Sequence, residues 1–133
     1  MKLGVLMTLF SDKSFEKALN YVKKVGCEAV EIGVANYAKS PHCNPDKLLA
    51  NPAKVRKFKE TVAGRGLVIS ALSCHGNPLH PDKKVAEDYI AGQHKTILLA
   101  EALGVKYHQY LFWLSGRRTE GPDAQLDNLF LAE

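Results

Sequence analysis

A polar cluster follows an apolar run in the middle of the chain, and it contains residue types that can do chemistry. Ser73, Cys74 and His75 come directly after the run 67–72, and the loop signal Gly-Asn-Pro at 76–78 follows them. The apolar run predicts a strand buried on both faces, which places His75 at its carboxyl end. An imidazole can transfer protons near neutral pH and can also ligate a metal ion. A histidine that only packs in a loop is the alternative, but the position at a strand end favours a functional role.

A carboxylate forms the second candidate, because Glu31 lies inside the otherwise apolar run 28–34. A carboxylate in such a run is costly unless it is paired, hydrogen-bonded or ligating something. Neighbouring parallel strands bring their carboxyl ends to one edge, so we expect Glu31 and His75 to share that edge. Together they suit general acid–base catalysis or metal ligation. The alternative is a buried Glu–His pair that only stabilises the end of the sheet.

Strand and helix patterns alternate along the chain and must position these two residues. Apolar residues recur at helical spacing over 15–25 after the N-cap candidate Ser14, and Asn-Pro pairs at 44–45 and 51–52 predict a short helical turn and a longer helix. The predicted elements are strands at 2–8, 28–34 and 67–73 and helices at 14–25, 45–64 and 82–103. The expected inner face of the last helix consists of Val85, Tyr89, Ile90, Ile97 and Leu98. This order predicts an α/β fold with parallel strands and with the helices on one outer face.

The composition fits one ordinary domain, since the chain has 133 residues, of which 46% are hydrophobic. The net charge is only +4, and most basic residues are scattered or suit solvated helix faces, so we expect no nucleic-acid partner. No apolar run reaches membrane-spanning length, so we expect no membrane partner. Three cysteines are too few and too unevenly spaced for a disulfide framework or a structural zinc motif. Without a signal-peptide core at the start, the sequence predicts a reduced, cytoplasmic protein.

Several segments, taken in order, carry a resemblance to a known family. They are Met1–Val5, Ala29–Gly33, His42–Asp46, Ile69–Pro81 and Leu99–Val105. Together they resemble the sugar phosphate isomerase/epimerase family, which has the xylose-isomerase-like TIM barrel and belongs to a superfamily that includes endonuclease IV. The resemblance implies a partial (β/α) TIM barrel of about three to four N-terminal βα units with parallel strands. Residues 1–106 would form the N-terminal half of that domain, because a whole barrel has eight strands and about 250 residues.

The resemblance also implies a chemistry, that of a metal-dependent sugar or sugar-phosphate isomerase or epimerase. It implies that Glu31 and His75 are catalytic, that His75 can ligate a divalent metal ion, and that His42, Asn77 and His80 lie on the same rim as substrate contacts. An endonuclease IV-like hydrolase or an inositol-type dehydratase is the alternative enzyme. A non-catalytic, self-associating half-barrel is a third. For the 133-residue chain we expect no activity, since the family's main metal ligands lie on later strands.

The segment after Val105 departs from the family, which typically continues with Phe-Ser-Gly-Cys-Pro-Gly and later with Pro-Asn-Trp. One permissible back-translation of residues 108–116, read one base later, encodes Ile-Asn-Thr-Phe-Ser-Gly-Cys-Pro-Gly. The same shift over residues 123–133 encodes Thr-Pro-Asn-Trp-Ile-Thr-Cys-Ser-Trp-Pro. We therefore treat residues 107–133 as a divergent tail and hypothesise a frameshift near Tyr107 or His108. A naturally divergent segment is the alternative, and the gene sequence downstream of residue 106 decides between them.

Overall fold

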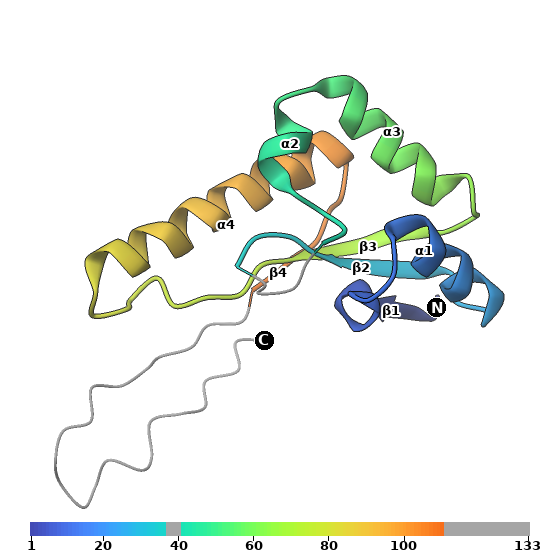
Figure 1. The fold of residues 1–133 in the computed structure, drawn as a ribbon, viewed down its shortest axis with the longest axis horizontal. Helices are drawn as coiled ribbons and strands as arrows, with labels where there is room; N and C mark the ends of the chain where they lie inside the picture. The colour runs from blue at the N-terminus through green and yellow to red at the C-terminus, as the bar shows by residue number, and fades with distance from the viewer. Residues whose placement is uncertain (37–40, 111–133) are drawn as a thin grey trace, which may run out of the picture.

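The computed structural model describes residues 1–36 and 41–110, whose strands form one parallel sheet (Figure 1). The strands, in their order across the sheet, are β1 (Gly4–Leu6), β2 (Ala29–Gly33), β3 (Val68–Ser73) and β4 (His108–Gln109). Each neighbouring pair is parallel. The predicted fold class, a partial TIM barrel with parallel strands, is therefore confirmed, and a fourth short strand adds to the three that the sequence patterns predicted.

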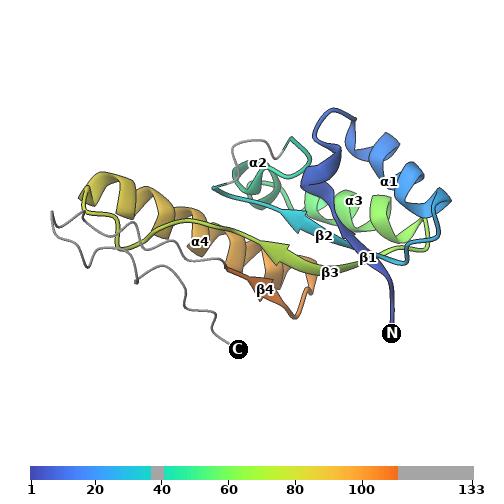
Figure 2. The ribbon, with the colours of Figure 1, turned by 90° about the horizontal axis from the view of Figure 1, so that it is seen from below.

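The helices connect these strands and cover one side of the sheet (Figure 2). They are the 3-10 helix η1 (Met7–Phe10) and the α-helices α1 (Phe15–Lys24), α2 (Pro45–Leu49), α3 (Pro52–Ala63) and α4 (Lys83–Leu103). One buried cluster joins the outward side chains of β2 and β3, such as Ile32 and Leu72, to α1, α3 and α4. None of the helices in the described part of the chain is long and apolar enough to span a membrane.

Side-chain caps explain where the helices begin. The Ser14 hydroxyl accepts a hydrogen bond from the amide of Lys17 and caps α1. Asn44 caps α2 and Asn51 caps α3, each with a proline at the first helical position. Proline is favourable there because its fixed φ suits the helix and its missing N–H would have no partner in the first turn. These caps confirm the short turn and longer helix that the two Asn-Pro pairs predicted.

The predicted inner face of α4 is wrong at three of its five residues, whereas Val85 and Tyr89 are half-buried. Ile90, Ile97 and Leu98 are 38%, 48% and 53% exposed. The buried residues of α4 are Gly92, Thr96, Leu99, Ala100 and Leu103. The small residues Gly92, Thr96 and Ala100 share this face with two leucines, and they let the helix approach its neighbours closely.

A register shift interrupts the pairing of β2 with β3. Val30 pairs with Ile69, whereas Glu31 pairs with Ala71, so Ser70 is an extra residue on β3. The Ser70 hydroxyl donates to the carbonyl oxygen of Val30 at 3.1 Å. This β-bulge therefore lies immediately beside the strand segment that carries Glu31.

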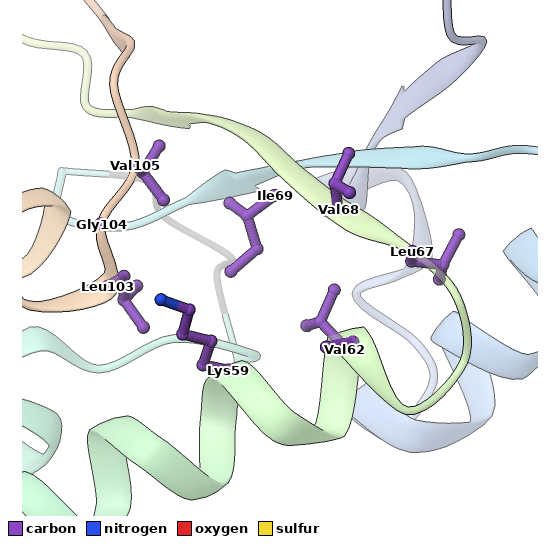
Figure 3. A pocket seen from close by; sticks show the side chains of 9 residues that line it. Lys59, Val62, Leu67, Val68, Ile69, Leu103, Gly104 and Val105 are labelled. Carbon is purple, nitrogen blue, oxygen red and sulfur yellow. The ribbon is translucent and has the colours of Figure 1, made fainter.

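An apolar pocket of about 220 Å³ lies at the opposite end of the sheet from the predicted site (Figure 3). Val62 of α3, Val68 and Ile69 of β3, and Leu103 at the end of α4 are among the side chains that line it. Lys59 adds the only charged side chain among the lining residues. Barrel enzymes place their chemistry at the carboxyl ends of the strands, so we do not assign the active site to this pocket.

Candidate functional site at the carboxyl ends of the strands

Glu31 and His75 occupy the same end of the sheet. Glu31 is in β2 and pairs with Ala71 of β3, while His75 follows the end of β3 by two residues. Burial lowers the pKa of His75 below its ordinary value of 6.5, and the negative charge of Glu31 opposes that shift in part. The two side chains are therefore close enough to interact electrostatically, as the strand order predicted.

The lowered pKa keeps the His75 imidazole neutral at pH 7. A neutral imidazole has one nitrogen that can accept a proton and one that can donate a hydrogen bond. Beside a carboxylate, it can take part in proton transfer or bind a hydroxyl group of a ligand. The rim thus holds two groups with different charges that can both act on one small molecule.

Gln109 of β4 supplies the partner that a carboxylate in an apolar strand requires. When its side-chain amide nitrogen is turned toward β2, that nitrogen lies 3.1 and 3.2 Å from the two Glu31 carboxylate oxygens. We adopt this orientation because it pairs a donor with two acceptors. Gln109 was not among the predicted site residues, because the sequence segments used for the resemblance end at Val105.

His108 of β4 was also missed by the sequence patterns. Burial lowers the pKa of His108, and repulsion from the positive charge that His75 carries when it is protonated lowers it further. Its Nε2 atom is buried and has no hydrogen-bond partner among the described residues. The signal that could have found both β4 residues is their position, since the fourth strand also ends at this rim.

His42 makes its own contacts with the loop after η1 and with the helical layer. Its Nε2 atom lies 2.9 Å from the carbonyl oxygen of Lys13. Its ring centroid lies 5.6 Å from that of Phe15, which stacks on Phe58 at 4.7 Å. Within the described residues, His42 therefore joins the loop after η1 to the helical layer, and its predicted substrate contact stays a prediction.

Asn77 and His80 shape the turn that leads into α4. The Asn77 side-chain oxygen accepts from the amide of Leu79 at 3.1 Å, and its carbonyl oxygen accepts from the amide of His80 at 3.0 Å. The Nδ1 atom of His80 accepts from the amide of Asp82, which in turn caps α4. These bonds give both residues a local structural role, and a role in substrate binding stays a prediction.

The described residues do not make a complete metal site. No group of three or more His, Cys, Asp or Glu side chains in the described ranges is arranged to hold a metal ion. Glu31 and His75 offer two donors, whereas a catalytic metal such as zinc usually has about three protein ligands and an open position. A divalent metal would need further ligands from outside the described part of the chain.

Sequence comparison finds a family and a curated relative that match this chain. The family model described as "Xylose isomerase-like TIM barrel" matches residues 19–131. The uncharacterized protein YfiH of Bacillus subtilis (strain 168) is 32% identical over 128 residues, which is 96% of this chain and 40% of that protein. The chain thus spans well under half the length of this curated relative.

Comparison with solved structures finds the same fold in sugar epimerases and a dehydratase. A D-psicose 3-epimerase solved in the presence of D-fructose has a TM-score of 0.56 at 14% identity and covers 83% of this chain and 37% of its own. The same enzyme from Clostridium cellulolyticum H10, solved with D-tagatose, has a TM-score of 0.55 at 16% identity, with coverage of 83% and 37%. The probable 3-DHS dehydratase AsbF from Bacillus anthracis has a TM-score of 0.57 at 16% identity, with coverage of 84% and 38%.

Proposed function

Because the chain belongs to the xylose isomerase-like TIM barrel family, we propose that it is the amino-terminal part of a sugar or sugar-phosphate isomerase or epimerase. The observation that carries this proposal is the placement of Glu31 and His75 at the carboxyl ends of adjacent parallel strands. The epimerases among the structural neighbours share the fold at 14% and 16% identity, and the sugar substrate class named for them is taken here as part of the proposal.

The proposed chemistry is the removal and return of a proton on a carbon next to a carbonyl group. We assign proton removal to the Glu31 carboxylate, which Gln109 can hold in place by donating to its oxygens. We assign to His75 the binding of a neighbouring sugar oxygen, because a neutral imidazole can donate a hydrogen bond without carrying charge. His42, Asn77 and His80 are proposed to contact the rest of the sugar. The divalent metal implied by the family resemblance would take the His75 imidazole as one ligand and would then polarise the sugar oxygen in its place, which leaves the Glu31 carboxylate to remove the proton.

A dehydratase is the second candidate, because AsbF matches the fold as well as the epimerases do. Dehydration also begins with proton removal, so the same two residues would serve. The reactions differ in their products, since epimerisation conserves the atoms of the sugar and dehydration releases water. An endonuclease IV-like activity is less favoured, because the net charge of +4 is spread over the chain.

Exchange of the substrate proton with solvent tests the proposal. The 133-residue chain in D₂O, with a divalent metal and a panel of ketoses and their phosphates, should incorporate no deuterium, because Glu31 and His75 cannot complete a site. A chain whose gene is repaired near codon 107 should incorporate it. In that longer chain, Glu31→Gln and His75→Gln should each slow exchange by roughly 10²–10⁴-fold. Robust turnover by the 133-residue chain, or none by the repaired chain on any ketose, would contradict the proposal.

We also propose that the 133-residue chain self-associates. In the described part of the sheet, β1 and β4 each have a neighbour on one side only. Leu3, directly before β1, and Val68, the first residue of β3, are 65% and 40% exposed. Unpaired parallel edges with apolar surface favour association with a second chain, most simply as a two-fold dimer. Light scattering on dilute protein measures this, and a clean monomer with little dye-accessible apolar surface would contradict it.

The cytoplasm is the proposed location. All three cysteines, Cys27, Cys43 and Cys74, are buried free thiols. Free thiols are usual in reducing compartments, where structural disulfides are rare. Fractionation of cells that express the native gene tests this, and recovery outside the cytoplasm would overturn it.

A further inference from the structure

The segment that carries His75 is held on both sides by residues from other elements. Cys74 precedes His75 and is fully buried, and its thiol accepts a hydrogen bond from the side-chain amide of Asn36 at 3.3 Å. Gly76 follows His75 and lies against the ring of Tyr89 in α4, so closely that a Cβ at position 76 would collide with that ring. His75 therefore stands between two anchored neighbours.

Asn36 makes its contacts from an uncommon backbone conformation. It is the non-glycine residue with positive φ, at 63°, among the described residues. Asparagine adopts this left-handed region more readily than most residues do. Two residues before it, the amide of Val34 donates to the carbonyl oxygen of Ser73. The chain thus leaves β2 alongside β3 and then turns sharply, which brings the Asn36 side chain over the β3 end.

Helix α4 leaves room for this side chain. A Cβ added at Gly92 would lie 2.6 Å from the Asn36 side-chain oxygen and 2.9 Å from its nitrogen. The same nitrogen also donates to the carbonyl oxygen of Tyr89 at 3.3 Å. A glycine in the middle of a helix is unfavourable for the helix itself, and close contact with another group is a physical reason for one to be there.

We propose that Asn36 is a positioning residue, which together with Tyr89 and Gly92 clamps the segment 74–76 and so fixes the His75 imidazole opposite Glu31. Asn36 links the end of β2, which carries Glu31, to the end of β3 and to α4. The clamp itself depends only on these contacts, whereas the catalytic use of the held imidazole rests on the proposed function.

Alkylation of the cysteines in the native 133-residue chain tests the clamp. Asn36→Gly keeps the positive φ and deletes the amide, and Asn36→Asp keeps the size but removes the N–H donors. In both variants, iodoacetamide should modify Cys74 roughly two- to tenfold faster, the factor expected for loss of one ordinary hydrogen bond. Cys27 and Cys43 are internal controls, and burial raises the pKa of Cys43 to about 12, which makes it slow to react unless the chain unfolds.

A matched variant and a second readout complete the test. Asn51→Gly removes the hydrogen bond that the Asn51 side chain accepts from the amide of Ala53 at the start of α3, and it should leave Cys74 protected. In nuclear magnetic resonance spectra, the imidazole signals of His75 should shift and broaden in both Asn36 variants, whereas those of the exposed His94 should not. Equal acceleration at all three thiols in both variants, or unchanged His75 signals, would overturn the clamp. Neither readout involves sugar turnover, so failure of the proposed function leaves this test intact.

Discussion

Replacing Gly92 by alanine measures how tightly α4 is docked against the end of β2. In an unobstructed helix interior, Gly→Ala stabilises a protein by about 1 kcal/mol. At position 92 the new Cβ would occupy the place of the Asn36 amide, so both of its 3.3 Å hydrogen bonds would be lost. These bonds are long, and each contributes about 0.5–1 kcal/mol. We therefore expect Gly92→Ala to leave the free energy of unfolding unchanged or to lower it by about 1 kcal/mol.

A double-mutant cycle with Asn36→Gly separates the two contributions. Once the amide is absent, Gly92→Ala should stabilise the chain, although a contact of 3.0 Å with the Ala35 Cβ keeps the gain below its full value. The two substitutions should couple by about 1–2 kcal/mol, measured by urea denaturation of the four proteins with their slopes compared. Additivity within about 0.5 kcal/mol would refute the reasoning, because it would mean that Asn36 and Gly92 act independently.

Two further predictions concern the core and the pH dependence. Leu99→Ala, at a fully buried site of α4, should lower the free energy of unfolding by about 2–5 kcal/mol. Leu98→Ala, at a 53% exposed site, should lower it far less. Equal losses for the two variants in urea denaturation would contradict the assigned contact face of α4. Burial lowers the pKa of His75 and His108 below 6.5 in the folded chain. As pH falls through 6.5, the unfolded chain therefore binds protons before the folded chain does, and the free energy of unfolding should fall. The fall should level off once the pH is below the folded pKa values of both histidines. Urea midpoints at pH of about 7.5 and 5.5 check this sign, and a double variant with glutamine at both positions should lose much of the difference.

The strands and helices could be predicted because their local patterns are strong. Asn44 and Asn51, each followed by proline, mark the starts of α2 and α3. The contact face of α4 could not be predicted by apolar content, because leucines lie on both faces: Leu98 is exposed while Leu99 is buried. The close approach of α4 depends instead on Gly92, and only the three-dimensional contact with Asn36 shows why that position is small.

The candidate site was predictable to the extent that strand order determines it. Glu31 and His75 share a rim because their strands are adjacent and parallel. The hydrogen bond that ties His42 to Lys13 depends on loop geometry, which no sequence period reveals. Gln109 escaped prediction because it lies after residue 106. The frameshift hypothesis concerns residues 107–133, of which 111–133 lie outside the described residues, so it stays a prediction.

The extra residue on β3 has a consequence for how relatives of this protein should be aligned. A β-bulge takes up one extra residue, so the residues after it keep the partners and the faces that a regular strand without that residue would give them. With Ser70 present, Ala71 and Ser73 share the face of Glu31, and His75 continues that series. Deleting Ser70 would leave Ile69 opposite Val30 and Ala71 opposite Glu31, so the imidazole would stay at the rim. A relative that lacks the extra residue therefore aligns correctly only with a gap at position 70, and without that gap the alignment would compare the thiol of one protein with the imidazole of the other.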